Sequence, residues 1–340
     1  MRLNMKRTIA TPLLFLLPGM LLGGCITGPG AIILRKEAAK EFNIEDAIDK
    51  ITHIDINTSI AKVELIPSDH YSVEIDYLYW DEEPDYSLTD GKLHFDDGDS
   101  IPNSYSINFK LDNTIKVYLP DNADLSNLSI KNSSGNVELS GFVAGDMKVT
   151  VSYGDLTIRK AASNNAKIKL SSGNSTIDDF EVGNLKFTNS YGDSDFDNIN
   201  TGSTMLLKDI AYDKIDISMS SGKAELGGII CSNLQLNNSY GDVICEEIKA
   251  DKLDAGLSSG NLTVNKSDIK DIDAKNSYGD VNLSLIGPKA DYSLNLDTSY
   301  GSIQVGNKKY KEHMDVDRAG TRSIYADLSS GNVKISFFNN

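Results

Sequence analysis

The sequence has little of the material from which metal-centred or redox enzymes are built: 4 His, 3 Cys and 1 Trp in 340 residues. The four histidines, at positions 53, 70, 94 and 313, are scattered and show no metal-ligand spacing. Basic residues are also scarce, 33 against 49 acidic ones, for a net charge of -16 without an offsetting basic block. From the scarcity of His and Cys we predict no metal and no cofactor. From the negative charge we predict no nucleic-acid partner, because the acidic protein would repel a polyanion.

Long hydrophobic runs are absent after the N-terminus, which itself reads as a targeting segment. Residues 1–24 carry Arg2, Lys6 and Arg7, no acid, and a short apolar stretch that ends in Leu22-Gly23-Gly24-Cys25. This pattern predicts a signal peptide, with an incidental cysteine as the alternative to a functional one. The ending is similar to a bacterial lipobox, which implies cleavage before Cys25 and its acylation, for instance with palmitate.

The predicted mature protein is an extracytoplasmic lipoprotein anchored to the membrane through its lipid, at the outer membrane or cell surface in a Gram-negative cell. Removing residues 1–24 leaves 30 basic against 49 acidic residues, a net charge of -19. No later segment is long and apolar enough to span a bilayer.

An internal repeat occupies two thirds of the chain. A Ser-(Ser/Tyr)-Gly tripeptide occurs ten times, with a base interval of 19 and three longer intervals of 30, 22 and 30. Its glycines stand at positions 135, 154, 173, 192, 222, 241, 260, 279, 301 and 331. Such a fixed period is the signature of a repeat architecture.

Aligning the copies on their glycine reveals apolar columns seven and five residues before it and four after it, separated mostly by polar positions. This alternation predicts two short strands per copy, joined at the glycine, each with one buried face. A 19-residue unit is too short for a strand–helix–strand crossover. We predict an all-β fold, a β-solenoid of stacked coils of about 19 residues. A 38-residue double coil is the less favoured alternative.

The residue before the glycine alternates between serine and tyrosine over most copies. The tyrosine copies mostly carry Asn three residues before the glycine, where the serine copies mostly carry a large apolar residue. We interpret this as volume compensation, which favours tyrosines packed at the corner. The alternative is an outward stripe that binds a ligand such as a glycan, formed by Tyr153, Tyr191, Tyr240, Tyr278 and Tyr300. The serine two before each glycine is expected to form a hydrogen-bonded ladder.

The remaining segments complete the predicted organisation: a signal peptide (1–24), a tether with room for a short helix (25–50), a strand-rich N-terminal cap (51–125) and the solenoid (126–340). The C-terminal coil, Ser329 to Asn340, is expected to expose or cap the far end. In the cap, Tyr77, Tyr79 and Trp80 alternate poorly and form a second candidate binding site, an edge strand being the equal alternative. Cys231 and Cys245 occupy different repeat positions, which favours two thiols over a disulfide.

The run TIKVYLPDNADLSNLSIKNSSGNVELSG and the copies after it resemble the putative-adhesin β-strand repeat family of bacterial envelope proteins, over about residues 51–340. The resemblance implies a non-enzymatic, adhesin-like binding or scaffold module whose partner is a surface glycan or an envelope protein. An accessory role in envelope-stress sensing or signalling is the alternative. A polysaccharide-cleaving β-helix is less favoured, because no carboxylate cluster accompanies a suitable base.

Overall fold

The computed structural model describes residues 40–79, 82–98, 112–201, 214–316 and 321–338. Within these ranges the chain is built of β-strands and a single three-residue 3-10 turn, η1 (Lys289–Asp291), so the all-β prediction is confirmed. No helix in the described part is long and apolar enough to cross a membrane.

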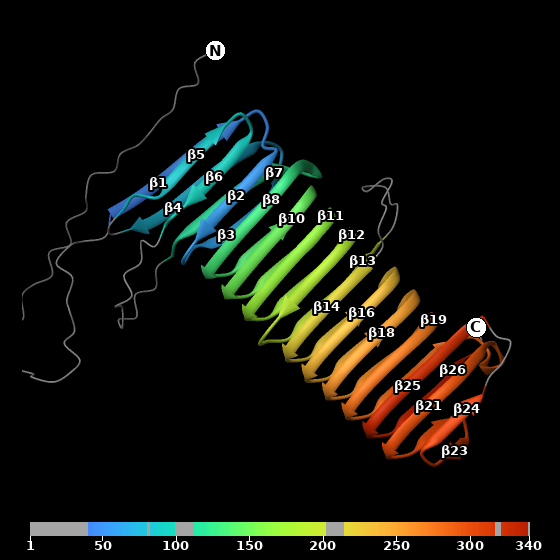
Figure 1. Ribbon diagram of the computed structural model, residues 1–340. Helices are drawn as coiled ribbons and strands as arrows, with labels where there is room; N and C mark the ends of the chain where they lie inside the picture. The colour runs from blue at the N-terminus through green and yellow to red at the C-terminus, as the bar shows by residue number, and fades with distance from the viewer. Residues whose placement is uncertain (1–39, 80–81, 99–111, 202–213, 317–320, 339–340) are drawn as a thin grey trace, which may run out of the picture.

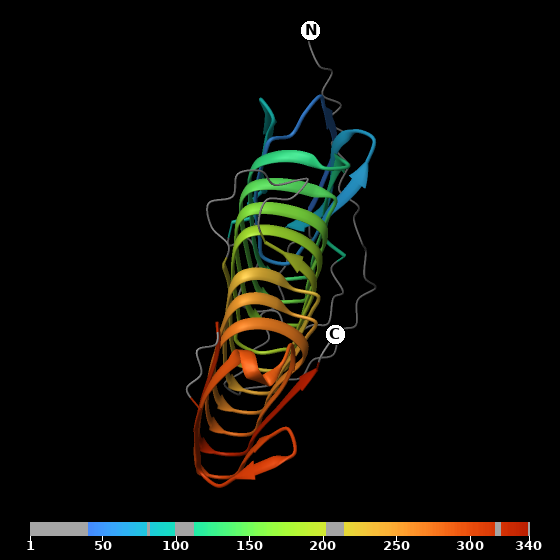
Figure 2. The ribbon, with the colours of Figure 1, turned by 90° about the vertical axis from the view of Figure 1, so that its right-hand side faces the viewer.

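The strands form an elongated, solenoid-like stack of coils (Figures 1 and 2). Neighbouring strands of the repeats run parallel, and the residue numbers of register partners differ by 19: Val149 pairs with Ile168, and Ile168 with Phe187. Across the first insertion the difference becomes 30, as between Leu185 and Ile215. The prediction of a 19-residue coil is therefore confirmed, and the 38-residue double coil is wrong.

Each coil contributes to two faces of the stack. Face 1 contains the strands that lead into the glycine corner, and its order along the stack differs from the order in sequence. Face 1 consists of β5 (Asp85–Thr89), β6 (Lys92–Asp96), β2 (His53–Thr58), β8 (Ala123–Ser134), β10 (Phe142–Tyr153), the later parts of β11 (Leu156–Ser172) and β12 (Ser175–Asn189), β14 (Lys214–Ser221), β16 (Ile230–Tyr240), β18 (Lys249–Ser259), the later part of β19 (Leu262–Tyr278), β25 (Arg322–Ser330), β21 (Tyr292–Tyr300) and β24 (His313–Val316).

Face 2 contains the strands that follow the corner. It consists of β1 (Lys40–Ile48), β4 (Tyr71–Tyr79), β7 (Thr114–Pro120), β3 (Lys62–Ser68), β9 (Val137–Ser140), the first parts of β11 and β12, β13 (Ser194–Asn200), β15 (Ala224–Gly227), β17 (Val243–Glu246), the first part of β19, β20 (Val281–Ile286), β26 (Val333–Phe338), β22 (Ile303–Val305) and β23 (Lys308–Tyr310).

The apolar columns of the sequence form the core between the faces. Val149, Ile168 and Phe187 stack on successive coils and are at most 1% exposed. Full burial of such a side chain stabilises a fold by about 1.5–3 kcal/mol. The core runs the length of the stack, so each coil depends on its neighbours to cover its apolar surface.

The first and the last coil in sequence order each lie one position inward from an end of the stack. β2 lies between β6 and β8. At the other end β25 lies between β19 and β21, so the last coil in sequence is flanked on both sides (Figure 1). Arg322 secures it, because its Nη1 donates to the Tyr292 hydroxyl at 2.9 Å and lies 2.7 Å from Asp268. The prediction that the C-terminal coil lies at the far end, exposing or capping it, is wrong.

Antiparallel strands occupy the outer edge of each face. β1 and β5 pair antiparallel with β4 and β6 at one end, and β23 and β24 pair antiparallel with β22 and β21 at the other. β1 lies where the sequence predicted a tether with a short helix. The insertion after Gly301 supplies β23 and β24. Parallel coils therefore end in short or charged edges, which discourages uncontrolled strand addition.

A second corner, six residues after the glycine, was not apparent from the sequence. It carries a left-handed backbone conformation in Gly141, Lys160, Asp179, Asn198, Gly228, Glu247 and Lys266, and Asn122, whose N–H donates to the Gly141 carbonyl, has the same conformation. This corner has no clear signature in the sequence because only some of these residues are Gly, Asn or Asp, the types that favour positive φ. The strain is borne by the packing of the coils on both sides.

Candidate functional site

The tyrosines of the repeat project outward at the glycine corner. Their exposed fractions are 67% for Tyr153, 64% for Tyr191, 65% for Tyr240, 66% for Tyr278 and 80% for Tyr300. The interpretation that volume compensation packs these rings at the corner is therefore wrong. They are the largest hydrophobic side chains left exposed on the repeats.

The asparagines behind the tyrosines explain the pattern that the sequence suggested. Asn238 is buried, and its Nδ2 donates to the Gly222 carbonyl at 2.9 Å and to the Gly241 carbonyl at 3.2 Å. Asn189 bridges the carbonyls of Gly173 and Gly192 in the same way. The amide therefore ties two successive corners together from inside, while the tyrosine of the same copy faces solvent.

Glycine holds the corner rigidly because no side chain fits there. Gly241 has φ +132, and an added Cβ would lie 2.1 Å from the Gly222 carbonyl oxygen. Equivalent approaches recur from coil to coil along the column. Since the backbone is fixed by these contacts, the tyrosines beside it stand on a rigid frame rather than on a loop.

The alternation of tyrosine and serine is a property of the stack rather than of the sequence. In the sequence the order ends Tyr278, Tyr300, Ser330, which breaks the pattern. In space Ser330 pairs with Tyr278 on one side and with Tyr300 on the other, because β25 is inserted between β19 and β21. Tyrosines thus stand on every second coil, about 10 Å apart, at twice the spacing of neighbouring strands.

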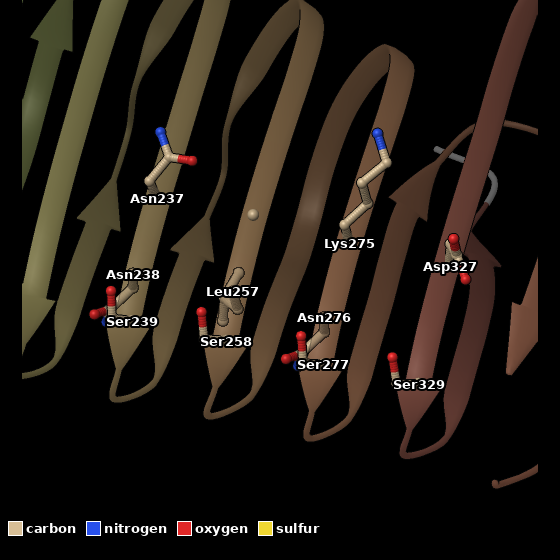
Figure 3. A pocket seen from close by; sticks show the side chains of 11 residues that line it. Asn237, Asn238, Ser239, Leu257, Ser258, Lys275, Asn276, Ser277, Asp327 and Ser329 are labelled. Carbon is tan, nitrogen blue, oxygen red and sulfur yellow. The ribbon is translucent and has the colours of Figure 1, made fainter. Parts of the chain in front are cut away.

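Serine hydroxyls line face 1 next to the tyrosines. Figure 3 shows Ser239, Ser258, Ser277 and Ser329 at equivalent places on successive coils. Their hydroxyls bond to no protein group in the described residues, so the predicted hydrogen-bonded ladder is wrong. Together with Asn237, Lys275 and Asp327 they border a shallow hollow of about 450 Å³ above Gly256, whose missing side chain opens it. This surface offers hydroxyl, amide and charged groups to a polar ligand.

A second ladder stiffens the same corner from outside. The residue after each glycine is usually Asn or Asp, and its Oδ1 accepts the backbone N–H of the equivalent residue on the next coil. The Asp155 oxygen accepts from Asn174 at 2.8 Å, and the Asn174 oxygen from Asp193 at 3.0 Å. Because an amide accepts as well as a carboxylate, alternating Asn with Asp keeps the bonds and separates the like charges.

The three residues of the second candidate binding site, Tyr77, Tyr79 and Trp80, do not form one exposed surface in the described structure. Tyr77 is 2% exposed, and its hydroxyl donates to the buried carboxylate of Asp97. Burial, followed by this carboxylate, raises the pKa of Tyr77 far above its usual value. Tyr77 is therefore a core residue and not a contact residue. Tyr79 is partly exposed, with Lys40 Nζ 5.5 Å from its ring centre, whereas Trp80 lies outside the described residues.

The two cysteines in the described residues form no reactive site. Cys231 and Cys245 are buried and no disulfide joins them, as the sequence favoured. Burial, followed by proximity to Cys231, raises the pKa of Cys245 to about 12. Within the described ranges no three His, Cys, Asp or Glu side chains gather closely enough to hold a metal ion. Cys25 lies outside the described residues.

Comparison with known proteins places this geometry in a family. The model of the Toastrack DUF4097 family matches residues 51–206 and again 200–336. No curated protein matches the sequence. Among solved structures, the chain is similar to a putative cell adhesion protein from Clostridium sporogenes ATCC 15579, at 10% identity and a TM-score of 0.22, covering 88% of this chain and 100% of that one. The two family matches together span the whole repeat region, and the chain belongs to the Toastrack DUF4097 family.

Proposed function

We propose that the protein is a non-enzymatic, adhesin-like binding protein of the cell envelope, and that the tyrosine–serine corner is its contact surface. The observation that carries the proposal is the row of five exposed tyrosines beside the rigid glycine corners, three of which are also tied by a buried asparagine. Tyrosine offers a large, rigid contact area at low entropic cost, and serine offers adaptable hydrogen bonds. Repetition along the stack lets many weak contacts add up.

The ligand class that suits this surface is a neutral surface glycan. A sugar chain presents apolar ring faces as well as hydroxyls, and the corner presents aromatic rings beside the Ser239, Ser258 and Ser277 hydroxyls. The tyrosine spacing of about 10 Å leaves room between rings for part of a ligand to enter. An envelope protein is the alternative partner.

The test replaces Tyr191, Tyr240 and Tyr278 together by serine. Serine already occupies this column in the alternate coils, so the fold should be retained and the melting temperature should change little. Binding to neutral glycans on an array should weaken at least tenfold. The matched triple replacement by phenylalanine keeps the rings and should retain most binding. Undiminished binding by the serine variant would contradict the proposal.

We further propose that acylated Cys25 anchors the protein on the outer side of the membrane. The lipobox-like sequence before Cys25 supports this placement, as does the absence of a later apolar span in the sequence. About 0.8 kcal/mol per buried CH₂ makes two or more acyl chains a stable anchor. Mass spectrometry of the membrane-purified protein should find Cys25 as an acylated N-terminus; an intact residue 1–24 segment would contradict it.

A further inference from the structure

Three lysines stack on one another on face 1, in a protein that is otherwise strongly acidic. Lys148, Lys167 and Lys186 are register partners on β10, β11 and β12, and all three are exposed. Lys131 and Lys169 lie two residues further along their strands, on β8 and β11, and are also exposed. The basic block that the linear sequence lacks is thus assembled by the 19-residue coil.

The coil geometry compensates these lysines at one end of the row only, where Asp216 is the register partner of Lys186. Like charges directly opposite on neighbouring strands destabilise a sheet. Elsewhere on face 1, lysines have carboxylate neighbours: Lys275 lies 3.3 Å from Asp273, and Lys214 lies 3.9 Å from Asp216. No acidic side chain of the described residues lies within ion-pair distance of the five lysines in the block. The arrangement costs stability and is explained if something outside the chain compensates it.

The surface around the lysines is shaped to receive a ligand. A shallow hollow of about 580 Å³ runs over β10, β11, β12 and β14. It is lined by the three stacked lysines, by the neighbouring polar column that includes Asp146, and at its β14 end by Lys214 and Asp216. In that column Asn184 Nδ2 donates to Asn165 Oδ1 at 2.9 Å, and Asn165 Nδ2 donates to Asp146 Oδ1 at 2.9 Å. Cations and an ordered amide row therefore border the same hollow, which suits a ligand that carries both anions and hydroxyls.

We propose that this lysine ladder binds a linear anionic polysaccharide, one with carboxylates or phosphates at regular intervals along its length. The lysines recur about every 4.8 Å along the stack, so a chain lying along the hollow could meet them in succession. The site is separate from the tyrosine corner and does not depend on the function proposed for it.

A narrow chain fits the charge distribution of face 1 better than a flat anionic membrane does. The column that contains the stacked lysines continues along the stack as Asp216, Gln235, Asp254 and Asp273. A bilayer pressed on this face would meet those carboxylates as well as the lysines, and like charges would repel. A polysaccharide can lie along the lysines and end before Gln235, so of the carboxylates in this column it meets Asp216 alone.

The decisive variant is Lys167→Glu, because stability and binding should change in opposite directions. It turns three stacked cations into an alternating row, so the melting temperature should rise. Binding to polygalacturonate or to poly(glycerol phosphate), measured at low ionic strength, should weaken more than tenfold. Whichever of the two probes binds wild type more tightly identifies the anion as carboxylate or phosphate. Wild-type binding should fall steeply towards about 0.15 M salt, as contacts between point charges do.

A control triple variant that removes the same number of charges distinguishes the effect of the lysine ladder on binding from the effect of net charge. Lys148→Gln, Lys167→Gln and Lys186→Gln together should weaken binding more than tenfold, whereas Lys249→Gln, Lys308→Gln and Lys334→Gln together should weaken it less than threefold. Equal loss in both triples would overturn the proposal, as would failure of wild type to bind either probe at low salt. Tighter binding to vesicles of phosphatidylglycerol and phosphatidylcholine than to either polymer would assign the ladder to a lipid surface instead.

Discussion

At the scale of single residues, two separate requirements favour glycine at most corners: the positive φ angle and the lack of space for a Cβ atom. Gly241→Ala should destabilise the protein by about 3 kcal/mol or more, because the added methyl meets the Gly222 carbonyl oxygen in addition to the unfavourable φ. Gly306→Ala is the matched control: Gly306 has φ +60 but nothing within 4 Å of the added Cβ, so about 1 kcal/mol is expected. Denaturant unfolding measures both, and equal losses would mean that the close approach contributes nothing.

The acidic residues of face 2 provide a pH-dependent prediction. Partial burial, followed by Glu225, Asp197 and Asp178, raises the pKa of Asp195 above its usual value. Folding therefore favours the protonated form, so this group's contribution to stability falls as pH rises through the raised pKa. Asp195→Asn should raise the melting temperature at pH 7.

That gain should shrink on acidification and disappear towards about pH 3, below the ordinary Asp pKa of about 3.9, where the carboxyl is protonated in folded and unfolded chains alike. Thermal melts of wild type and Asp195→Asn at a series of pH values measure the difference between them. A gain that persists at pH 3 would show that it comes from packing and not from charge.

At the scale of elements, the inserted C-terminal coil predicts how a truncation behaves. Ending the chain after Thr321 removes β25 and β26, which separate β19 and β20 from β21 and β22. The segment from Tyr292 to Val316 then loses its main partner, so it should become sensitive to protease and the melting temperature should fall. If this coil lay at the end of the stack, its loss would leave residues 292–316 protected. Limited proteolysis with mass spectrometry distinguishes the two arrangements.

The sequence was sufficient to predict the coil and its core, because the 19-residue period equals the offset between residues that pair on neighbouring coils. It did not reveal the order of the terminal coils, since β19 and β25 pair across a sequence offset, Ile272 with Ile324, that matches no repeat interval. One signal was available: the Ser/Tyr alternation that fails between Tyr278 and Tyr300 is restored if Ser330 is placed between them.

The candidate surfaces were harder to predict than the core. The direction of the tyrosines was misread because Asn238 and its equivalents looked like space fillers, whereas they bond the glycine carbonyls. The lysine ladder is visible in the sequence only when positions 148, 167 and 186 are compared at the repeat spacing. Surface columns carry no apolar signature, so nothing in the composition draws attention to them.

At the scale of the whole molecule, the stack separates surfaces of different chemistry. The exposed tyrosines line the glycine corner along the stack. The stacked lysines occupy one segment of face 1. Acidic residues such as Asp195 and Glu225 are cross-strand neighbours on face 2. Each surface is a column of the repeat, so its length follows from how many successive coils keep the same residue type. Ligand choice can therefore change by substitution within a column while the core stays the same.

The inward position of the first and last coils also bears on how the protein folds. β2 emerges early from synthesis, yet it needs β6 on one side and β8 on the other before its edges are satisfied. The far end of the stack cannot close until β25 and β26, the last strands in the chain, have been released. Simple growth of a solenoid from one coil to the next is thus interrupted at both ends by long-range closure, which is the slow kind of step. Completion of the fold therefore depends on β25 and β26, and a chain halted before these strands keeps open strand edges.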